Sequence, residues 1–232
     1  KANESVNIDR EGDYQIVGSR GQVGDIDRTL KLTSFSGARI NISGELPPPG
    51  EEGWPMLKFK IKFGGTEYEV GGEKVVVEDI PPQKVKVMVR RDDFRRTYED
   101  VTVTCDQEAV CQGEVELAGV TPGDNYAILI KGPVHLAKRF CRNQQEGHCW
   151  WGEEDISLAS GENEFDWTKA PLEPGDVNND RKVDSLDFSQ VRAALGTKGD
   201  NIPEDVNFNG EVNSQDLVFV LSTLSTRYED EL

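Results

Sequence analysis

The segment "GDVNNDRKVDSLDF" (Gly175–Phe188) decides the fold of the C-terminal quarter of the chain. Oxygen-bearing Asp or Asn side chains stand at positions 176, 178, 180, 184 and 187, and apolar residues follow at helical spacing. One interpretation is a set of Asx turns, because Asp and Asn bond readily to the backbone of a turn. The other is a loop whose oxygen atoms gather around a cation.

The same rhythm recurs 29 residues later, and this repeat favours the cation. Eight residues are identical at that offset, from Asp176 and Asp205 at the start to Leu195 and Leu224 at the end. Each copy continues into an amphipathic pattern, which predicts a helix after each loop. Two copies in register indicate an internal duplication rather than chance turns.

Calcium is the cation that fits this spacing. Ca²⁺ takes about six to eight oxygen ligands, and a twelve-residue loop supplies them from its positions 1, 3, 5, 7, 9 and 12. Position 8 carries Val183 and Val212, which can pair the two loops in a short ladder and face the core. We therefore predict two Ca²⁺ sites. The predicted ligands are Asp176, Asn178, Asp180, the Lys182 carbonyl, Asp184 and Asp187 in the first loop, and Asp205, Asn207, Asn209, the Glu211 carbonyl, Asn213 and Asp216 in the second.

The residues before each loop exclude a full EF-hand, which has a helix on both sides. Pro171 and Pro174 precede the first loop, and Gly199 and Pro203 precede the second, so no entering helix of normal length fits. Each unit is therefore a loop with an exiting helix only. This duplicated arrangement, with Asp at position 12, resembles type I dockerin modules over about residues 175–225.

The resemblance implies calcium-dependent folding and binding to a cohesin partner. In such modules, loop positions 10 and 11 and the helices make the partner contacts. The second predicted helix also presents extra apolar surface, which needs cover from a cohesin-like partner or from the rest of the chain. The residues at loop positions 10 and 11 are Ser185, Leu186, Ser214 and Gln215, and the extra apolar surface is that of Val218 and Phe219.

Two features depart from the family pattern. Position 6 of the first loop is Arg181 where glycine is expected, and a side chain in that sharp turn costs about 1 kcal/mol of strain. The second loop keeps Gly210 but has two carboxylates at ligand positions, against four in the first loop. We predict two calcium sites of unlike affinity. The 29-residue period also leaves a longer connection, "GTKGDNIPE", than compact dockerins have.

The region before the repeat is predicted to be mainly β, as an antiparallel β-sandwich. In "MLKFKIKF" (56–63), apolar residues alternate with lysines, which is the pattern of a strand with one buried face. Further short apolar runs are separated by Gly, Pro, Asn and Asp, which is typical of a β-sandwich. The segment "GVTPGDNYAILIKGP" (119–133) resembles a turn and strand of transthyretin-like or immunoglobulin-like modules. We divide the chain into a polar N-terminal arm or edge strand (1–29), the sandwich (30–167), a proline-stiffened linker (168–174) and a small α-helical, dockerin-like calcium-binding domain (175–232).

Four cysteines form two locally spaced pairs. An even count with loop-closing spacing predicts disulfides and an exported protein. Local pairing is our choice among the three connectivities. Four free thiols are one alternative, and a zinc site that uses His148 is another, although no C-x-x-C pair is present. The cysteines are Cys105, Cys111, Cys141 and Cys149.

Charge and hydropathy indicate which partners are excluded and in which cellular compartment the protein is expected. The formal net charge of −17 repels phosphate backbones, which excludes nucleic acid as a partner. No run approaches the ~20 apolar residues that span a bilayer. The polar start "KANESVNIDREGDY" is no signal peptide, so we expect that any signal or membrane anchor was removed before Lys1. Together with the cysteines, this predicts an extracellular or cell-surface protein.

Motifs of catalysis are missing from the sequence, so we expect no enzyme. It has no Ser-His-Asp set, no H-E-x-x-H motif and no phosphate loop. Three functions remain. The protein is a calcium-dependent adaptor for a cohesin-like partner, a self-assembling surface or filament subunit that uses calcium only for stability, or a carbohydrate-binding module that stacks sugars on aromatic faces. The candidate stacking residues are Trp54, Trp150, Trp151 and Trp167.

Overall fold

The computed structural model describes residues 2–6, 12–16, 28–32, 40–44, 53–144, 149, 155–224 and 229–230. The first four ranges are strands that pair among themselves. Strand β1 (Ala2–Val6) runs antiparallel to β4 (Ile40–Gly44), and β2 (Gly12–Ile16) runs antiparallel to β3 (Arg28–Leu32). The predicted N-terminal arm therefore contains regular strands, each with a partner within the first 44 residues.

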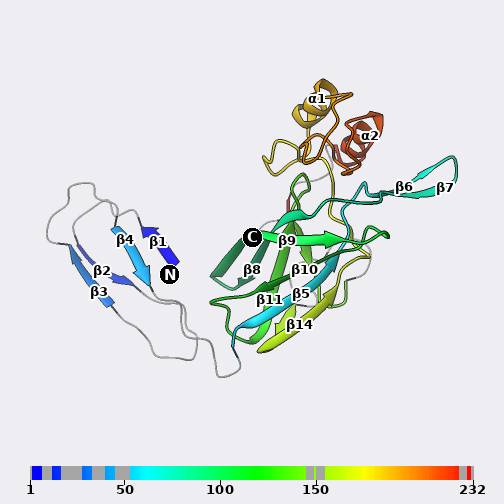
Figure 1. Cartoon of the computed structure of the whole chain (residues 1–232). Coiled ribbons are helices and arrows are strands. Elements are labelled where there is room, and N and C mark those ends of the chain that lie inside the picture. Colours follow the sequence, from blue (N-terminus) through cyan, green and yellow to red (C-terminus); the bar gives the residue numbers. More distant parts are fainter. Residues whose placement is uncertain are drawn as a thin grey trace.

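One continuous sheet forms the β-domain (Figure 1). Its strand order is β12-β11-β8-β9-β10-β5-β14, and β13 pairs with β11. All neighbours are antiparallel except β14 and β5, which run parallel, so the antiparallel prediction is wrong for that pair. The strands are β5 (Pro55–Ile61), β8 (Gln83–Arg91), β9 (Phe94–Cys105), β10 (Cys111–Glu116), β11 (Gly123–Lys131), β12 (Lys138–Phe140), β13 (Ile156–Leu158) and β14 (Gly161–Asp166).

Strand β5 shows how alternation builds this sheet. Leu57, Phe59 and Ile61 lie in the core with at most 2% of their surface exposed, as the period-two pattern predicts. The lysines between them point outward. Lys58 pairs with Glu162 of β14 at 2.5 Å, but both side chains are substantially exposed, so the pair adds little stability.

Trp167 closes the core. It follows β14 at one end of the strand order, and it stacks on Phe140 of β12 from the other end, with ring centroids 4.7 Å apart. Its indole nitrogen donates a hydrogen bond to the Cys141 carbonyl oxygen at 2.9 Å, so a fully buried polar atom is satisfied. The sheet therefore curls until its two ends meet across this ring.

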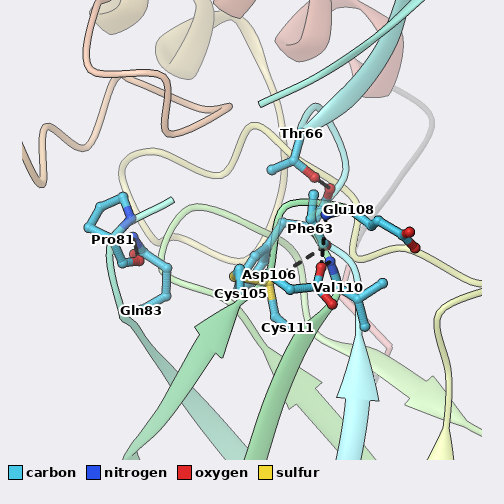
Figure 2. Close-up of a disulfide and its surroundings, with 10 residues drawn as sticks. Phe63, Thr66, Pro81, Gln83, Cys105, Asp106, Glu108, Val110 and Cys111 are labelled. Carbon is cyan, nitrogen blue, oxygen red and sulfur yellow. Dashed lines mark hydrogen bonds between the residues drawn. A yellow bond between two sulfur atoms is a disulfide. The ribbon is translucent and has the colours of Figure 1, made fainter. Parts of the chain in front are cut away.

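All four cysteines are in disulfides, with the pairing that local spacing favours. Cys105 and Cys111 are register partners on β9 and β10, and their bridge lies beside the turn held by Asp106 (Figure 2). The second bridge joins Cys141 to Cys149. The alternatives of free thiols and of a zinc site on these cysteines are therefore wrong, since none is free. His148 itself lies outside the described residues.

The C-terminal part contributes two helices, α1 (Ser185–Ala193) and α2 (Ser214–Thr223). They pack on each other beyond one end of the sheet, and a hairpin of β6 (Glu67–Val70) and β7 (Glu73–Val76) extends beside them (Figure 1). The predicted fold class, mainly β followed by a small helical part, is confirmed. Within the described residues, no helix is both long and apolar enough to cross a membrane.

Candidate functional site

The segment that leads into the first loop is bound to the β-domain along its length. The Leu172 amide donates to the Lys62 carbonyl at 2.9 Å, and the Gly64 amide donates to the Leu172 carbonyl at 2.8 Å. Farther on, the Gly175 amide donates to the Val134 carbonyl at 2.9 Å. Leu172 is fully buried. The stretch expected to be a linker therefore fixes where the first loop begins.

The first loop folds around the carboxylates at its positions 1 and 12. Asp176 Oδ1 accepts the Asp180 amide at 2.9 Å, and its Oδ2 accepts the Arg181 amide at 3.3 Å. At the other end, Asp187 Oδ1 accepts the amides of residues 177 and 178, and its Oδ2 accepts the Asp184 amide at 2.8 Å. Both carboxylates are fully buried inside the loop.

The second loop repeats this network atom for atom. Asp205 Oδ1 and Oδ2 accept the amides of Asn209 and Gly210 at 3.1 and 2.7 Å. Asp216 Oδ1 accepts the amides of residues 206 and 207, and its Oδ2 accepts the Asn213 amide at 2.8 Å. The duplication in the sequence is therefore a duplication of structure.

Ligand positions 9 and 12 of each loop also cap the helix that follows. Asp184 is the N-cap of α1, and its side chain accepts the Leu186 amide at 2.7 Å, while Asp187 accepts the Asp184 amide in return. Asn213 and Asp216 form the same reciprocal capping box on α2. The residues that would hold a cation therefore also start the helices.

Both loops share an apolar core with the β-domain. Val183 and Val212, at position 8 of each loop, are buried and face this core as predicted, as do Val191 and Val220 of the helices. Val134 and Leu136, from the segment after β11, complete the cluster. The predicted ladder between the two position-8 valines is wrong, because the Val212 backbone bonds to other residues. Its amide donates to the Thr197 carbonyl, and its carbonyl accepts the Gly196 amide.

Burial raises the pKa of the four aspartates at positions 1 and 12 above the ordinary value. In the second loop the Asp205 charge raises the pKa of Asp216 further, because the two carboxylates are close. No basic side chain among the described residues pairs with either of them. Two close, buried and unpaired carboxylates favour a bound cation. The raised values belong to Asp176, Asp187, Asp205 and Asp216.

The first loop differs because basic side chains reach its carboxylates. Lys131, the last residue of β11, lies 2.6 Å from Asp176 Oδ2. Lys182 of the loop itself lies 2.6 Å from Asp184 and 3.7 Å from Asp180. The Lys182 hydrogen bond lowers the pKa of Asp184. Three of the four carboxylates at the ligand positions of this loop therefore contact a lysine.

The two loops share their backbone geometry at positions 4 and 6 but carry different residues there. Arg181 at position 6 has φ 74°, close to the 83° of Gly210, so the strain expected for a side chain there is present. At position 4, Asn179 and Phe208 both lie in the left-handed region, with φ of 58° and 62°. Asn is tolerated there, whereas a bulky aromatic residue is unusual.

These loops offer the hard oxygen ligands that Ca²⁺ prefers, from carboxylates, amide side chains and the carbonyls of residues 182 and 211. The buried carboxylates at positions 1 and 12 of each loop fit that ion. In the described part of the chain, no three His, Cys, Asp or Glu side chains are gathered closely enough to hold a metal ion by themselves. The second loop has two carboxylates at its ligand positions, so most of its oxygens come from other groups.

Comparison with known proteins identifies this part of the chain. The family profile of the dockerin type I domain matches residues 174–225. This match confirms the predicted resemblance to type I dockerin modules. No curated protein matches the chain. Among solved structures, a chain of a type II cohesin–X-dockerin complex from Acetivibrio cellulolyticus is similar with a TM-score of 0.42 and 13% identity, over 73% of this chain and 95% of that one.

The predicted partner-binding residues of the dockerin module fall into two groups. Ser185, Leu186, Ser214 and Val218 are exposed, with 58% of Leu186 and 59% of Val218 accessible. Gln215 and Phe219 instead face the β6–β7 hairpin. The two halves of the repeat therefore present different surfaces.

Tyr68 of β6 covers Gln215 and Phe219 and so makes the surface of the second repeat differ from that of the first. Its hydroxyl donates to Gln215 Oε1 at 3.1 Å, and its ring meets Phe219 edge-on with centroids 5.6 Å apart. Gly65 permits the approach, because a Cβ atom there would lie 3.2 Å from the Phe219 ring. Of the two candidate covers for the extra apolar surface of α2, the chain itself takes Phe219 and leaves Val218 in solvent.

Three residues at the junction were missed by the sequence analysis. Lys131 contacts the first loop, and Phe208 of the second loop contacts Phe63 and His135 with centroid distances of 5.3 and 5.6 Å. Phe208 carried one usable signal, since it replaces the Asn179 of the first loop in an otherwise polar segment. Lys131 and His135 carried none, because they lie far from the loops in the sequence.

Proposed function

We propose that the dockerin module binds two calcium ions and docks a cohesin-type protein partner, so that the chain acts as a non-catalytic extracellular attachment or assembly protein. The ligands are those predicted for the two loops. The ions would neutralise the buried carboxylates and hold both loops in the conformation that starts α1 and α2. The module would then present its exposed helix positions to the partner.

The exposed apolar side chains on the two helices carry the proposal. Leu186, Val218 and Leu221 are each at least 50% exposed, although the inner residues of the same helices are fully buried. Val218 and Leu221 are three apart on α2, so they lie on one stripe of that helix. Large apolar side chains left in solvent at the positions where dockerins contact cohesins support a protein partner.

Immobilised type I cohesin modules test this proposal directly. The full chain should bind in calcium and be released by a chelator. Leu186→Asp and Val218→Asp should each weaken binding, because a charge would enter an apolar contact. Val70→Asp is the matched control, since Val70 is similarly exposed, at 53%, but lies at the far end of the β6–β7 hairpin. It should bind as the unmodified chain does.

The same assay separates the alternative functions. A chain that binds none of the immobilised cohesins but forms calcium-dependent oligomers would be a self-assembling surface subunit. Carbohydrate binding has no support from the described tryptophans, because Trp167 is fully buried in the core and Trp54 is half-buried. Trp150 and Trp151 lie outside the described residues. Calcium-independent capture by cohesin, or capture unaffected by both Asp substitutions, would contradict the proposal.

A further inference from the structure

A lysine of the β-domain reaches into the first calcium loop. The Lys131 ammonium lies 2.6 Å from Asp176 Oδ2, and it also contacts the Glu229 carboxylate and the His135 carbonyl, the latter at 3.1 Å. Its side chain is only 9% exposed, so water screens these contacts weakly. Asp176 and the His135 carbonyl accept hydrogen bonds from the ammonium group, and Glu229 adds an ion pair. Lys131 is thus fixed on the first ligand of the loop.

The second loop has no such cation and serves as an internal reference. Asp205 occupies the position of Asp176 and makes the same two amide contacts, yet no basic side chain among the described residues reaches it. The nearest equivalent is Lys198, which pairs with Glu211 at 2.8 Å. Glu211 is predicted to contribute its carbonyl rather than its carboxylate, and the Lys198 side chain is 68% exposed. At position 1 the loops therefore differ, because Asp176 has a buried lysine partner and Asp205 has none among the described residues.

We propose that Lys131 sets the calcium affinity of the first loop and makes that affinity depend on the β-domain. The proposal rests on the calcium binding proposed above. A positive charge held on Asp176 repels a second cation that uses the same carboxylate, so the first loop is the weaker site despite its four carboxylates. By linkage, calcium in the first loop weakens the ion pair between the module and β11 by the same factor.

Glu229 and Asp230 contact both the first loop and the β-domain. The Glu229 amide donates to the Arg181 carbonyl of the first loop at 3.2 Å, while its carboxylate contacts Lys131. The next residue, Asp230, accepts the Arg139 amide at 2.7 Å and donates its own amide to the Ala137 carbonyl. Glu229 therefore offsets part of the Lys131 charge and moderates its effect on the loop.

The test is a calcium titration of the full chain in chelator-buffered solution, followed by nuclear magnetic resonance. The Arg181 and Gly210 amides donate to Asp176 and Asp205, so their signals report the first and second loops separately. Lys131→Met should raise the affinity of the first loop about tenfold, within the roughly 5–150-fold of typical couplings, and leave the second loop unchanged. Lys131→Arg keeps the charge and should stay near the unmodified value.

Two further variants keep the test decisive if Lys131→Met folds poorly. Glu229→Gln leaves the lysine charge fully on Asp176 and should lower the affinity of the first loop. Lys198→Met is the matched control at the second loop and should change neither affinity by more than about twofold, because its ion pair is exposed. A first-loop affinity that is unchanged or lower in Lys131→Met, or a rise shared by both loops, overturns the inference. If the unmodified chain binds no calcium, the proposed function fails as well.

Discussion

Replacing Phe208 by asparagine tests whether packing or backbone strain decides the stability of the junction. Phe208 sits at position 4 of the second loop with φ 62°, where the first loop has Asn179. A non-glycine residue in the left-handed region costs about 1–2 kcal/mol, and asparagine less than most. Against this cost, the ring contacts Phe63 and His135 and borders three apolar clusters.

The packing outweighs the strain. Full burial of a phenylalanine is worth about 1.5–3 kcal/mol, so the half-buried Phe208 contributes about 1 kcal/mol. Its edge-on pairing with Phe63 adds about 1 kcal/mol. Phe208→Asn loses both but relieves about 1 kcal/mol of strain, which leaves a net loss of about 1 kcal/mol. Phe208→Ala loses the same packing without that relief, so it should cost about 2 kcal/mol.

Urea denaturation of the three chains in saturating calcium measures these differences. The midpoints should fall in the order unmodified, Phe208→Asn, Phe208→Ala, with unchanged slopes. Calcium binding at the second loop should persist in both variants, since Phe208 supplies no predicted ligand. A Phe208→Asn chain as stable as the unmodified one would refute the reasoning, because strain would then cost as much as the packing contributes. Equal losses in both variants would show that no strain is released.

Three further outcomes follow from the core and the loops. Burial lowers the pKa of His135 to about 3, so this side chain stays neutral in the folded protein while it takes up a proton in the unfolded chain. The stability that His135 contributes is therefore complete above about pH 6.5 and falls by up to about 1.4 kcal/mol per pH unit toward pH 3. His135→Gln should remove this part of the pH dependence of the unfolding free energy. Trp167→Ala should lower the unfolding free energy by about 3–5 kcal/mol in thermal melts, whereas Trp167→Phe should lose mainly the bond to the Cys141 carbonyl, about 1 kcal/mol. Asp216→Ala should destabilise the module by about 1–3 kcal/mol even in chelator, because three backbone amides lose their acceptor. The control Glu211→Ala should change stability by less than about 0.5 kcal/mol. Equal effects of the two substitutions in circular dichroism melts would contradict the loop geometry.

Local patterns account for what could be predicted from the sequence. The alternation in β5 and the duplicated loops are determined by residues close together in the chain, so periodicity was enough to find them. The same holds for the Cys105–Cys111 bridge, which closes a short turn between neighbouring strands.

Contacts between distant segments account for what could not be predicted. The parallel pairing of β14 with β5 joins segments about a hundred residues apart, and no local pattern encodes their direction. Tyr68 and Lys131 meet the module only because the β-domain carries them there. Their chemistry is ordinary for a strand, so nothing in their neighbourhood distinguishes them from other surface residues.

The parallel pairing of β5 and β14 also determines how the protein would carry tension. The chain enters the β-domain at the Pro55 end of β5 and leaves it at the Asp166 end of β14, which lies beside Lys60. A pull on the two flanking segments draws these strands past each other, so their interstrand bonds share the load together instead of opening one after another. The Leu172–Lys62 and Gly64–Leu172 bonds extend the same seam toward the dockerin module. An optical trap holding both ends should therefore record a single high-force rupture of this domain, whereas stepwise opening at low force would contradict it.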